Sequence, residues 1–257
     1  MRKILPFLLI LLLVLSSCAT KTGTVESCQT IYHTEIRLRP EELTDGMVSY
    51  FHLPEVANSG RHACRVEMSD GEVRIGRAGT YDSTFVRQFD YGYFAGVDLG
   101  EWDGWVRYYP YHTNLLDADP ELVANENCRG IVACEDRSRG YVITGNLMED
   151  SGKLYELVLA ESETVWEWHL IGALEGFPYS YSYRDDESGL LIATSKEIVS
   201  VSADQQIRTL FRSEYLKLEP SSILLCEDQI WCGLYAGLLR VDLSTLEQTW
   251  YWLDWDE

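Results

Sequence analysis

Much of the chain consists of short runs in which apolar and polar residues alternate, which is the period-two pattern of a β-strand with one face towards a core. The stretches 130–145 and 222–233 each contain an apolar run, Cys-Glu-Asp, a turn, a second apolar run and a closing glycine. The stretch 179–194 carries Tyr-Arg-Asp in the same place, and 85–96 carries an aspartate and two glycines. Two short runs around such a turn predict a β-hairpin in each case.

A second strand pair is expected after each of these hairpins. Its first strand begins after residues 60, 104, 152, 196 and 237, so the steps between units are 44, 48, 44 and 41 residues. The closing strand of the unit is expected at 164–170, 207–211 and 248–253, and two of these share a Trp-x-Trp alternation. The sequence therefore predicts an all-β protein built from five copies of a four-stranded unit.

A four-stranded unit that repeats at this period resembles the blade of a β-propeller. The resemblance covers residues 31–257 and implies five blades around a common axis, each covering the apolar face of the next. The first unit has the weakest pattern, and we expect 31–40 and 47–53 to supply its inner strands. Four blades with an N-terminal cap, or a β-sandwich, are the alternatives.

The N-terminal residues follow a secretory pattern. Two basic residues precede an apolar run, 4–15, that is too short for a comfortable membrane span. The run ends in Leu15-Ser16-Ser17-Cys18, which resembles the lipobox of bacterial lipoproteins. The resemblance implies a signal peptide over 1–17, fatty acids such as palmitate on Cys18, and a polar tether over 18–30. Thr20 follows the pattern of lipoproteins sent to the outer membrane; a plain secretory signal with an incidental cysteine is the alternative.

The composition is strongly acidic, with 41 Asp and Glu against 21 Lys and Arg and a net charge of −20. Removal of the leader leaves 19 basic residues and a net charge of −22. Such a surface argues against nucleic acid and anionic headgroups as direct partners. We expect a protein of the bacterial cell envelope that contacts the membrane through its lipid anchor and takes an envelope protein or a glycan as partner.

Six cysteines remain besides Cys18, in a chain expected in an oxidising compartment. Cys226 and Cys232 lie on the two arms of one expected hairpin, so we expect a disulfide between them. Cys128 and Cys134 have the same spacing, but a straight strand would hold them about 20 Å apart. Buried reduced thiols are the alternative for Cys134 and Cys226.

Two acidic loops are the most distinctive candidates for chemistry. The loop 96–105 lies between the second and third strands of its unit and carries Asp98, Glu101, Trp102, Asp103 and Trp105. The equivalent loop of the next unit, 145–152, carries Asn146, Glu149 and Asp150. Two such loops on one rim would offer oxygen ligands to Ca²⁺, the one cofactor that the sequence suggests, with Asp98, Glu101, Asp103, Asn146, Glu149 and Asp150 as the ligand set. The alternative is that these residues only form turns.

The chain carries no catalytic signature of the nucleophile-elbow, phosphate-loop or His-Glu-x-x-His type. Several five-bladed propellers are glycoside hydrolases, so a carbohydrate-active hydrolase using rim carboxylates is the alternative function. However, Asp136, Asp185 and Asp228 recur at the same turn of successive units and are expected to serve that turn. The sequence favours a non-catalytic binding or scaffolding module, with residues 98–105 against a protein, peptide or glycan partner.

Replacement of Cys18 by serine tests the lipid anchor. In cells supplied with an alkyne analogue of palmitate, we expect the unaltered chain to take up the label and to partition into detergent. Cys18→Ser should lose both properties, because each buried methylene contributes about 0.8 kcal/mol to membrane binding. Cys28→Ser is the matched control and should keep the label. Labelling that survives Cys18→Ser would contradict the lipobox interpretation.

Overall fold

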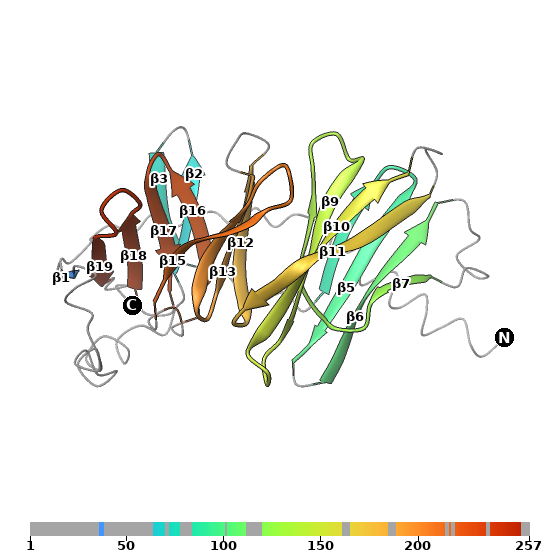
Figure 1. Ribbon diagram of the computed structural model, residues 1–257, viewed down its shortest axis with the longest axis horizontal. Helices are drawn as coiled ribbons and strands as arrows, with labels where there is room; N and C mark the ends of the chain where they lie inside the picture. Colours follow the sequence, from blue (N-terminus) through green and yellow to red (C-terminus); the bar gives the residue numbers. More distant parts are fainter. Residues whose placement is uncertain are drawn as a thin grey trace.

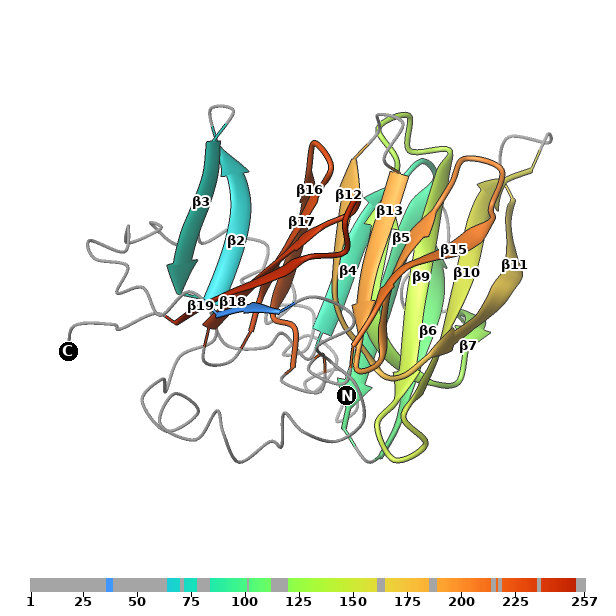
Figure 2. The same cartoon turned by 60° about the vertical axis from the view of Figure 1, so that its left-hand side comes forward.

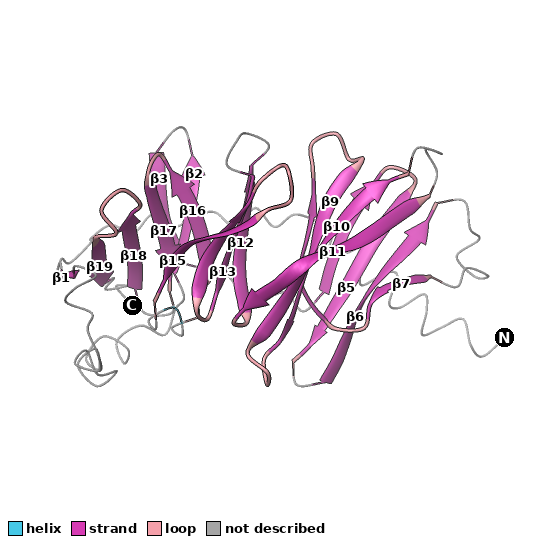
Figure 3. Cartoon of the chain, in the orientation of Figure 1, coloured by secondary structure: helices cyan, strands magenta, loops and turns pink. Residues whose placement is uncertain are grey.

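The computed structural model describes residues 36–38, 64–69, 72–77, 84–100, 102–111, 120–160, 165–184, 189–213, 216, 219–234 and 237–252. The regular elements of these ranges are β-strands, apart from a single residue of 3₁₀ conformation at Leu216 (Figures 1 and 3). Within the same ranges, no helix has the length and apolar character needed to span a bilayer. The expected all-β class is confirmed.

Four antiparallel sheets follow one another along the chain, each in strand order. Sheet β4–β7 comprises Thr84–Phe89, Gly92–Leu99, Trp102–Pro110 and Glu121–Ala124. Sheet β8–β11 comprises Asn127–Ala133, Arg139–Asn146, Ser151–Leu159 and Trp166–Glu175. Sheet β12–β15 comprises Pro178–Arg184, Gly189–Thr194, Glu197–Val201 and Ile207–Arg212. Sheet β16–β19 comprises Ser222–Cys226, Gln229–Gly233, Gly237–Asp242 and Gln248–Trp252, with β1 (Ile36–Leu38) added beside β19. Strands β2 (Cys64–Ser69) and β3 (Glu72–Arg77) form a separate hairpin.

The hairpins expected from the alternating pattern are all present. They are β4–β5, β8–β9, β12–β13 and β16–β17, and the expected closing strands are β11, β15 and β19. Three of the hairpin turns hold a non-glycine residue in the left-handed region, with φ of 65° at Tyr91, 55° at Arg137 and 54° at Glu227. Positive φ values are typical of the short turns whose twist matches that of the flanking strands.

The sheets bury both of their faces, which decides how they stack. On β9, Val142 packs towards sheet β4–β7, whereas its neighbours Tyr141 and Ile143 pack towards sheet β12–β15. On β13, Ile192 packs towards sheet β8–β11 and Leu191 packs towards sheet β16–β19. A sheet in a two-layer sandwich keeps one outer face, so these sheets, buried on both sides, exclude the sandwich alternative.

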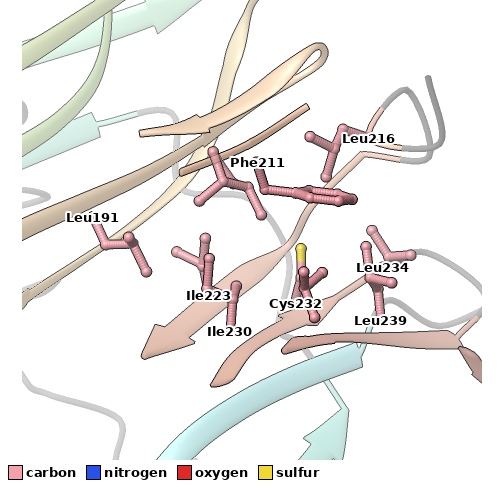
Figure 4. Close-up of a cluster of buried hydrophobic side chains, with 11 residues drawn as sticks. Leu191, Phe211, Leu216, Ile223, Ile230, Cys232, Leu234 and Leu239 are labelled. Carbon is pink, nitrogen blue, oxygen red and sulfur yellow. The ribbon is translucent and has the colours of Figure 1, made fainter. Parts of the chain in front are cut away.

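Each sheet places its first strand against the preceding sheet, as blades of a propeller do (Figures 1 and 2). Strand β8 lies on β4 to β6, β12 on β8 and β9, and β16 on β12 and β13. Strand β2 continues the series on β16 and β17, where Val66 packs with Leu224 and Leu238. Figure 4 shows one of these inter-sheet cores, in which Phe211 and Ile223 come from neighbouring sheets. The fold is therefore the expected propeller type, and its described units are three four-stranded sheets, the five-stranded sheet that β1 completes, and the hairpin β2–β3.

Two N-terminal strands pair differently from expectation. The segment 31–40 was expected as an inner strand, but it provides β1 at the outer edge of β19, with Ile36 opposite Trp250. Strand β2 was expected as the third strand of its unit, but it takes the position of a first strand against β16 and β17. The repeat period identifies strands, but an open sheet edge offers unpaired backbone groups to any extended segment.

The expected disulfide between Cys226 and Cys232 is not formed, and both are free thiols. The register of β16 and β17 pairs Cys226 with Gln229 and Cys232 with Ile223. The two cysteines are thus three positions apart along the hairpin, about 10 Å, and on opposite faces. Cys232 instead fills the core between two sheets. Cys128 is also buried, and this burial raises the pKa of its thiol to about 12.

Gly130 tests the close approach of sheets β8–β11 and β12–β15. A Cβ atom at Gly130 would overlap the ring of Tyr181 on β12. We expect Gly130→Ala to lower the free energy of unfolding by about 1–3 kcal/mol, the usual cost of overpacking, as measured by urea unfolding with tryptophan fluorescence. Gly172→Ala is the control, because its Cβ would meet only the end of Ile207, at 3.1 Å. Equal unfolding midpoints for the two variants would contradict this packing.

Candidate functional site

The turns that carry both acidic loops lie on the same edge of the stacked sheets. We call this edge the crossover rim: it holds the β5–β6, β9–β10 and β13–β14 turns and the passages at 125–126 and 176–177, where the chain moves to the next sheet. The opposite edge, with the β8–β9, β12–β13 and β14–β15 turns, is the hairpin rim. The strand order thus brings residues 98–105 and 145–152 to one rim, as their equal place in the repeat predicted.

Asp98 is the last residue but one of β5, and its carboxylate has two partners. Its Oδ1 accepts a hydrogen bond from the backbone N–H of Gly100 at 2.9 Å, and Gly100 takes the left-handed turn position with φ of 69°. Its Oδ2 pairs with Arg129 of the next sheet. The two side chains are only 14% and 10% exposed, so this ion pair is shielded from solvent and links two sheets.

Asn127 and Glu126 hold the passage between sheets β4–β7 and β8–β11. The Asn127 side chain accepts a hydrogen bond from the N–H of Leu99 at 2.9 Å and donates one to the carbonyl of Gly100 at 2.5 Å. Both bonds fix the β5–β6 turn. Glu126 pairs with Lys153 of β10. The passage at 125–126 and the start of β8 therefore contact both the β5–β6 turn of the preceding sheet and strand β10 of their own sheet.

Arg129 connects three sheets through one side chain. Besides Asp98, its Nε donates to the carbonyl of Pro178 at 3.0 Å, and Pro178 begins β12. Its guanidinium carbon lies 4.6 Å from the centroid of the Phe177 ring, within range of a cation–π interaction. A guanidinium suits this position because its donors form a planar fork that can satisfy several acceptors together.

Asp150 repeats this arrangement one sheet further along. It pairs with Lys196 at 2.7 Å, and its Oδ1 accepts hydrogen bonds from the N–H of Phe177 at 3.0 Å and from the hydroxyl of Ser195. Burial alone would raise the pKa of Asp150. The bonds from Lys196, Ser195 and Phe177 outweigh burial, so the pKa is lowered below its ordinary value. The carboxylate is therefore held ionised.

Of the proposed calcium ligands, Asp98, Asn146 and Asp150 have partners within the protein. The Asn146 side chain accepts hydrogen bonds from the N–H groups of Met148 at 3.0 Å and Glu149 at 3.2 Å, which is an Asx turn. Within the part of the chain that the structure describes, no three His, Cys, Asp or Glu side chains gather as a metal site. The side chains of Glu101, Trp102 and Asp103 lie outside the described residues.

The remaining residue of the 98–105 loop, Trp105, is half-buried on β6. The guanidinium carbon of Arg107 lies 4.7 Å from the centroid of its ring. Trp105 therefore belongs to the strand, and its ring contacts a neighbour on the same strand rather than standing free at the rim.

The sequence interpretation missed the basic partners and the apolar tips of this rim. Arg129 stands between Cys128 and Gly130, both buried, and a charge inside an apolar strand was the available signal for a buried pair. The tips are exposed large apolar side chains beside the two aspartates: Leu99 at 48%, Leu147 at 46% and Met148 at 74%.

Asp150→Asn tests the ion pair to Lys196. The folded-state pKa lies below the unfolded value of about 3.9, so the stabilisation is present above that value and is lost as pH falls through the folded pKa. Because the pair is partly exposed, we expect the variant to lose about 0.2–1 kcal/mol at pH 7 and to match the unaltered protein near pH 2. Urea unfolding across this range measures it. Asp228→Asn, in an exposed hairpin-rim turn, is the control; a deficit that persists at low pH would contradict the assignment.

No known protein family and no curated protein matches the sequence. Among solved structures, the chain is similar to an engineered GH43 glycoside hydrolase described as having endo-xylanase and exo-arabinofuranosidase activity. The TM-score is 0.37 at 9% identity, over 68% of this chain and 41% of that one. This chain thus spans less than half the length of that structure, and the likeness carries no argument about activity.

Proposed function

We propose that this protein is a lipid-anchored component of the bacterial cell envelope, in the outer membrane, that binds a protein or peptide partner at its crossover rim without catalysis. The lipobox supports the anchor, and the acidic composition supports a partner with basic groups. The observation that carries the proposal is that the rim aspartates are neutralised by the next sheet while apolar side chains beside them are exposed.

The ion-paired carboxylates of the crossover rim support a role other than catalysis. Asp98 pairs with Arg129, and Asp150 pairs with Lys196. A glycoside hydrolase needs a carboxylic acid that keeps its proton near neutral pH, which requires a raised pKa. The lowered pKa of Asp150 is the opposite of this requirement. The hydrolase alternative would need an acid pair formed by other residues.

The apolar tips support a peptide or protein as the occupant. Leu99, Leu147 and Met148 lie on two neighbouring turns of the rim and expose about half of their surface or more. Methionine is flexible and polarisable, and it is enriched at interfaces between proteins. The ion pairs fix the turns that carry these three side chains. Because the turns are already ordered, the entropic cost of binding is lower.

The double variant Leu99→Ser, Met148→Ser tests this surface. We expect recovery of a defined partner by the membrane-anchored chain in mild detergent to fall at least about tenfold, which corresponds to about 1.4 kcal/mol of binding. A photo-crosslinking residue at 148 should join the chain to the same partner, so that proximity and recovery are measured on one species.

Val165 supplies the matched control. It is 53% exposed, but it follows the β10–β11 turn on the hairpin rim. Val165→Ser should keep the partner, and a crosslinker at 165 should not reach it. Equal recovery by both variants, or equal crosslinking from both positions, would overturn the assignment of the partner to the crossover rim.

A further inference from the structure

A cleft of about 530 Å³ opens on the hairpin rim, between sheets β8–β11 and β12–β15. One wall is formed by the β8–β9 turn and the start of β9, and the other by the ends of β12, β13 and β14. Its volume lies within the range of sites for small molecules, about 300–1,000 Å³. The apolar tips and acidic loops of the crossover rim are at the other end of the strands, so this cleft is separate from the proposed binding surface.

Tyr141 lines the cleft and brings a hydroxyl group to it. Tyr141 is 5% exposed and its ring packs near Tyr183 across the cleft, with centroids 6.1 Å apart. Burial raises the pKa of Tyr141, so its hydroxyl remains a donor. Among the described residues, none accepts a hydrogen bond from it. A buried tyrosine hydroxyl normally has a partner, and here the open side is the cleft.

Arg139 is held beside this hydroxyl in a fixed position. Its Nη2 donates to the Oε1 of Glu156 at 3.0 Å. The Glu156 side chain is 5% exposed and also receives the amide of Gln205, from the β14–β15 turn. A guanidinium has five N–H donors. The contact with Glu156 uses one of them and orients the rest of the group at the cleft wall.

The charges of the lining balance. Arg139 and Arg184 are matched by Glu135 and Asp136, which lie on the exposed β8–β9 turn. An anion in the cleft would face the carboxylates of Glu135 and Asp136, with the buried carboxylate of Glu156 nearby. A cation would face the guanidinium groups of Arg139 and Arg184. A neutral molecule whose groups both donate and accept hydrogen bonds fits all four charges.

We propose that this cleft binds a neutral saccharide. Sugar hydroxyls accept hydrogen bonds from Tyr141 and Arg139 and donate to the carboxylates of the turn. The apolar face of a sugar ring packs on an aromatic side chain, a role that Tyr183 fills on the opposite wall. The site goes beyond the protein partner proposed for the crossover rim, since it uses other residues on the other edge of the sheets.

Cys134 provides a direct measurement of occupancy. Its half-buried thiol lines the cleft, whereas the half-buried thiol of Cys226 lies on the β16–β17 hairpin outside the lining. The reduced full-length protein is alkylated with N-ethylmaleimide in the presence of maltotriose, cellotriose or triacetylchitotriose, and each cysteine is followed by mass spectrometry. For a Kd near 1 mM, about 10 mM of a bound saccharide slows Cys134 alkylation about tenfold. Cys226 should react at an unchanged rate.

Tyr141→Phe removes the hydroxyl and keeps the ring, so it should abolish protection without a change in melting temperature. Tyr93→Phe, at an exposed tyrosine of β5, is the matched control and should retain protection. Binding of a neutral ligand should also persist in 1 M NaCl. The proposal fails if none of the three saccharides protects Cys134, if Tyr141→Phe protects as the unaltered protein does, or if sodium phosphate protects in a salt-sensitive manner instead.

Discussion

Burial of both faces of each central sheet is the constraint on which the rest of the molecule depends. Strand β9 shows it most directly, because Val142 faces one neighbouring sheet and Tyr141 faces the other. A sheet of this kind has no face that can remain in water, and adjacent sheets must pack closely enough that Gly130 has room for no side chain beside Tyr181. The inter-sheet cores, the shared rims and the cleft between two sheets are all consequences of this stacking.

Close stacking also determines how polar groups at the sheet ends are satisfied. Turns of neighbouring sheets are brought together, so Asp98 finds Arg129 and Asp150 finds Lys196 across the boundaries. Asp98 and Asp150, which look like candidate ligands along the sequence, are thereby used to connect sheets, and large apolar side chains are exposed beside them. The hairpin rim differs, because the paired Arg139 and the hydroxyl of Tyr141 border open space there. The two rims therefore offer different chemistry to a partner.

The sequence was sufficient for what depends on local pattern. Alternating runs and Asp/Gly turns located the hairpins, and their spacing gave the repeated unit. Register was beyond reach, since strands buried on both faces are apolar at consecutive positions and lack the alternation that distinguishes one register from the next. The separation of Cys226 from Cys232 depends on that register. The partners of Asp98 and Asp150 could not be predicted from the sequence either. They belong to the next sheet, and no spacing along the chain indicates which residues meet there. Buried Arg129 was visible in the sequence, but its partner was not.

The pairing of β1 with β19 has a consequence for the order of folding. Ile36 lies opposite Trp250, so the fifth strand of sheet β16–β19 joins segments from nearly opposite ends of the sequence. Such a contact closes a very long loop, and non-local closures of this kind form late. The sheets in between can each assemble from neighbouring hairpins before this pairing forms. Strand β1 must wait until β19 has been synthesised, and until then its backbone groups are open to capture by other extended chains.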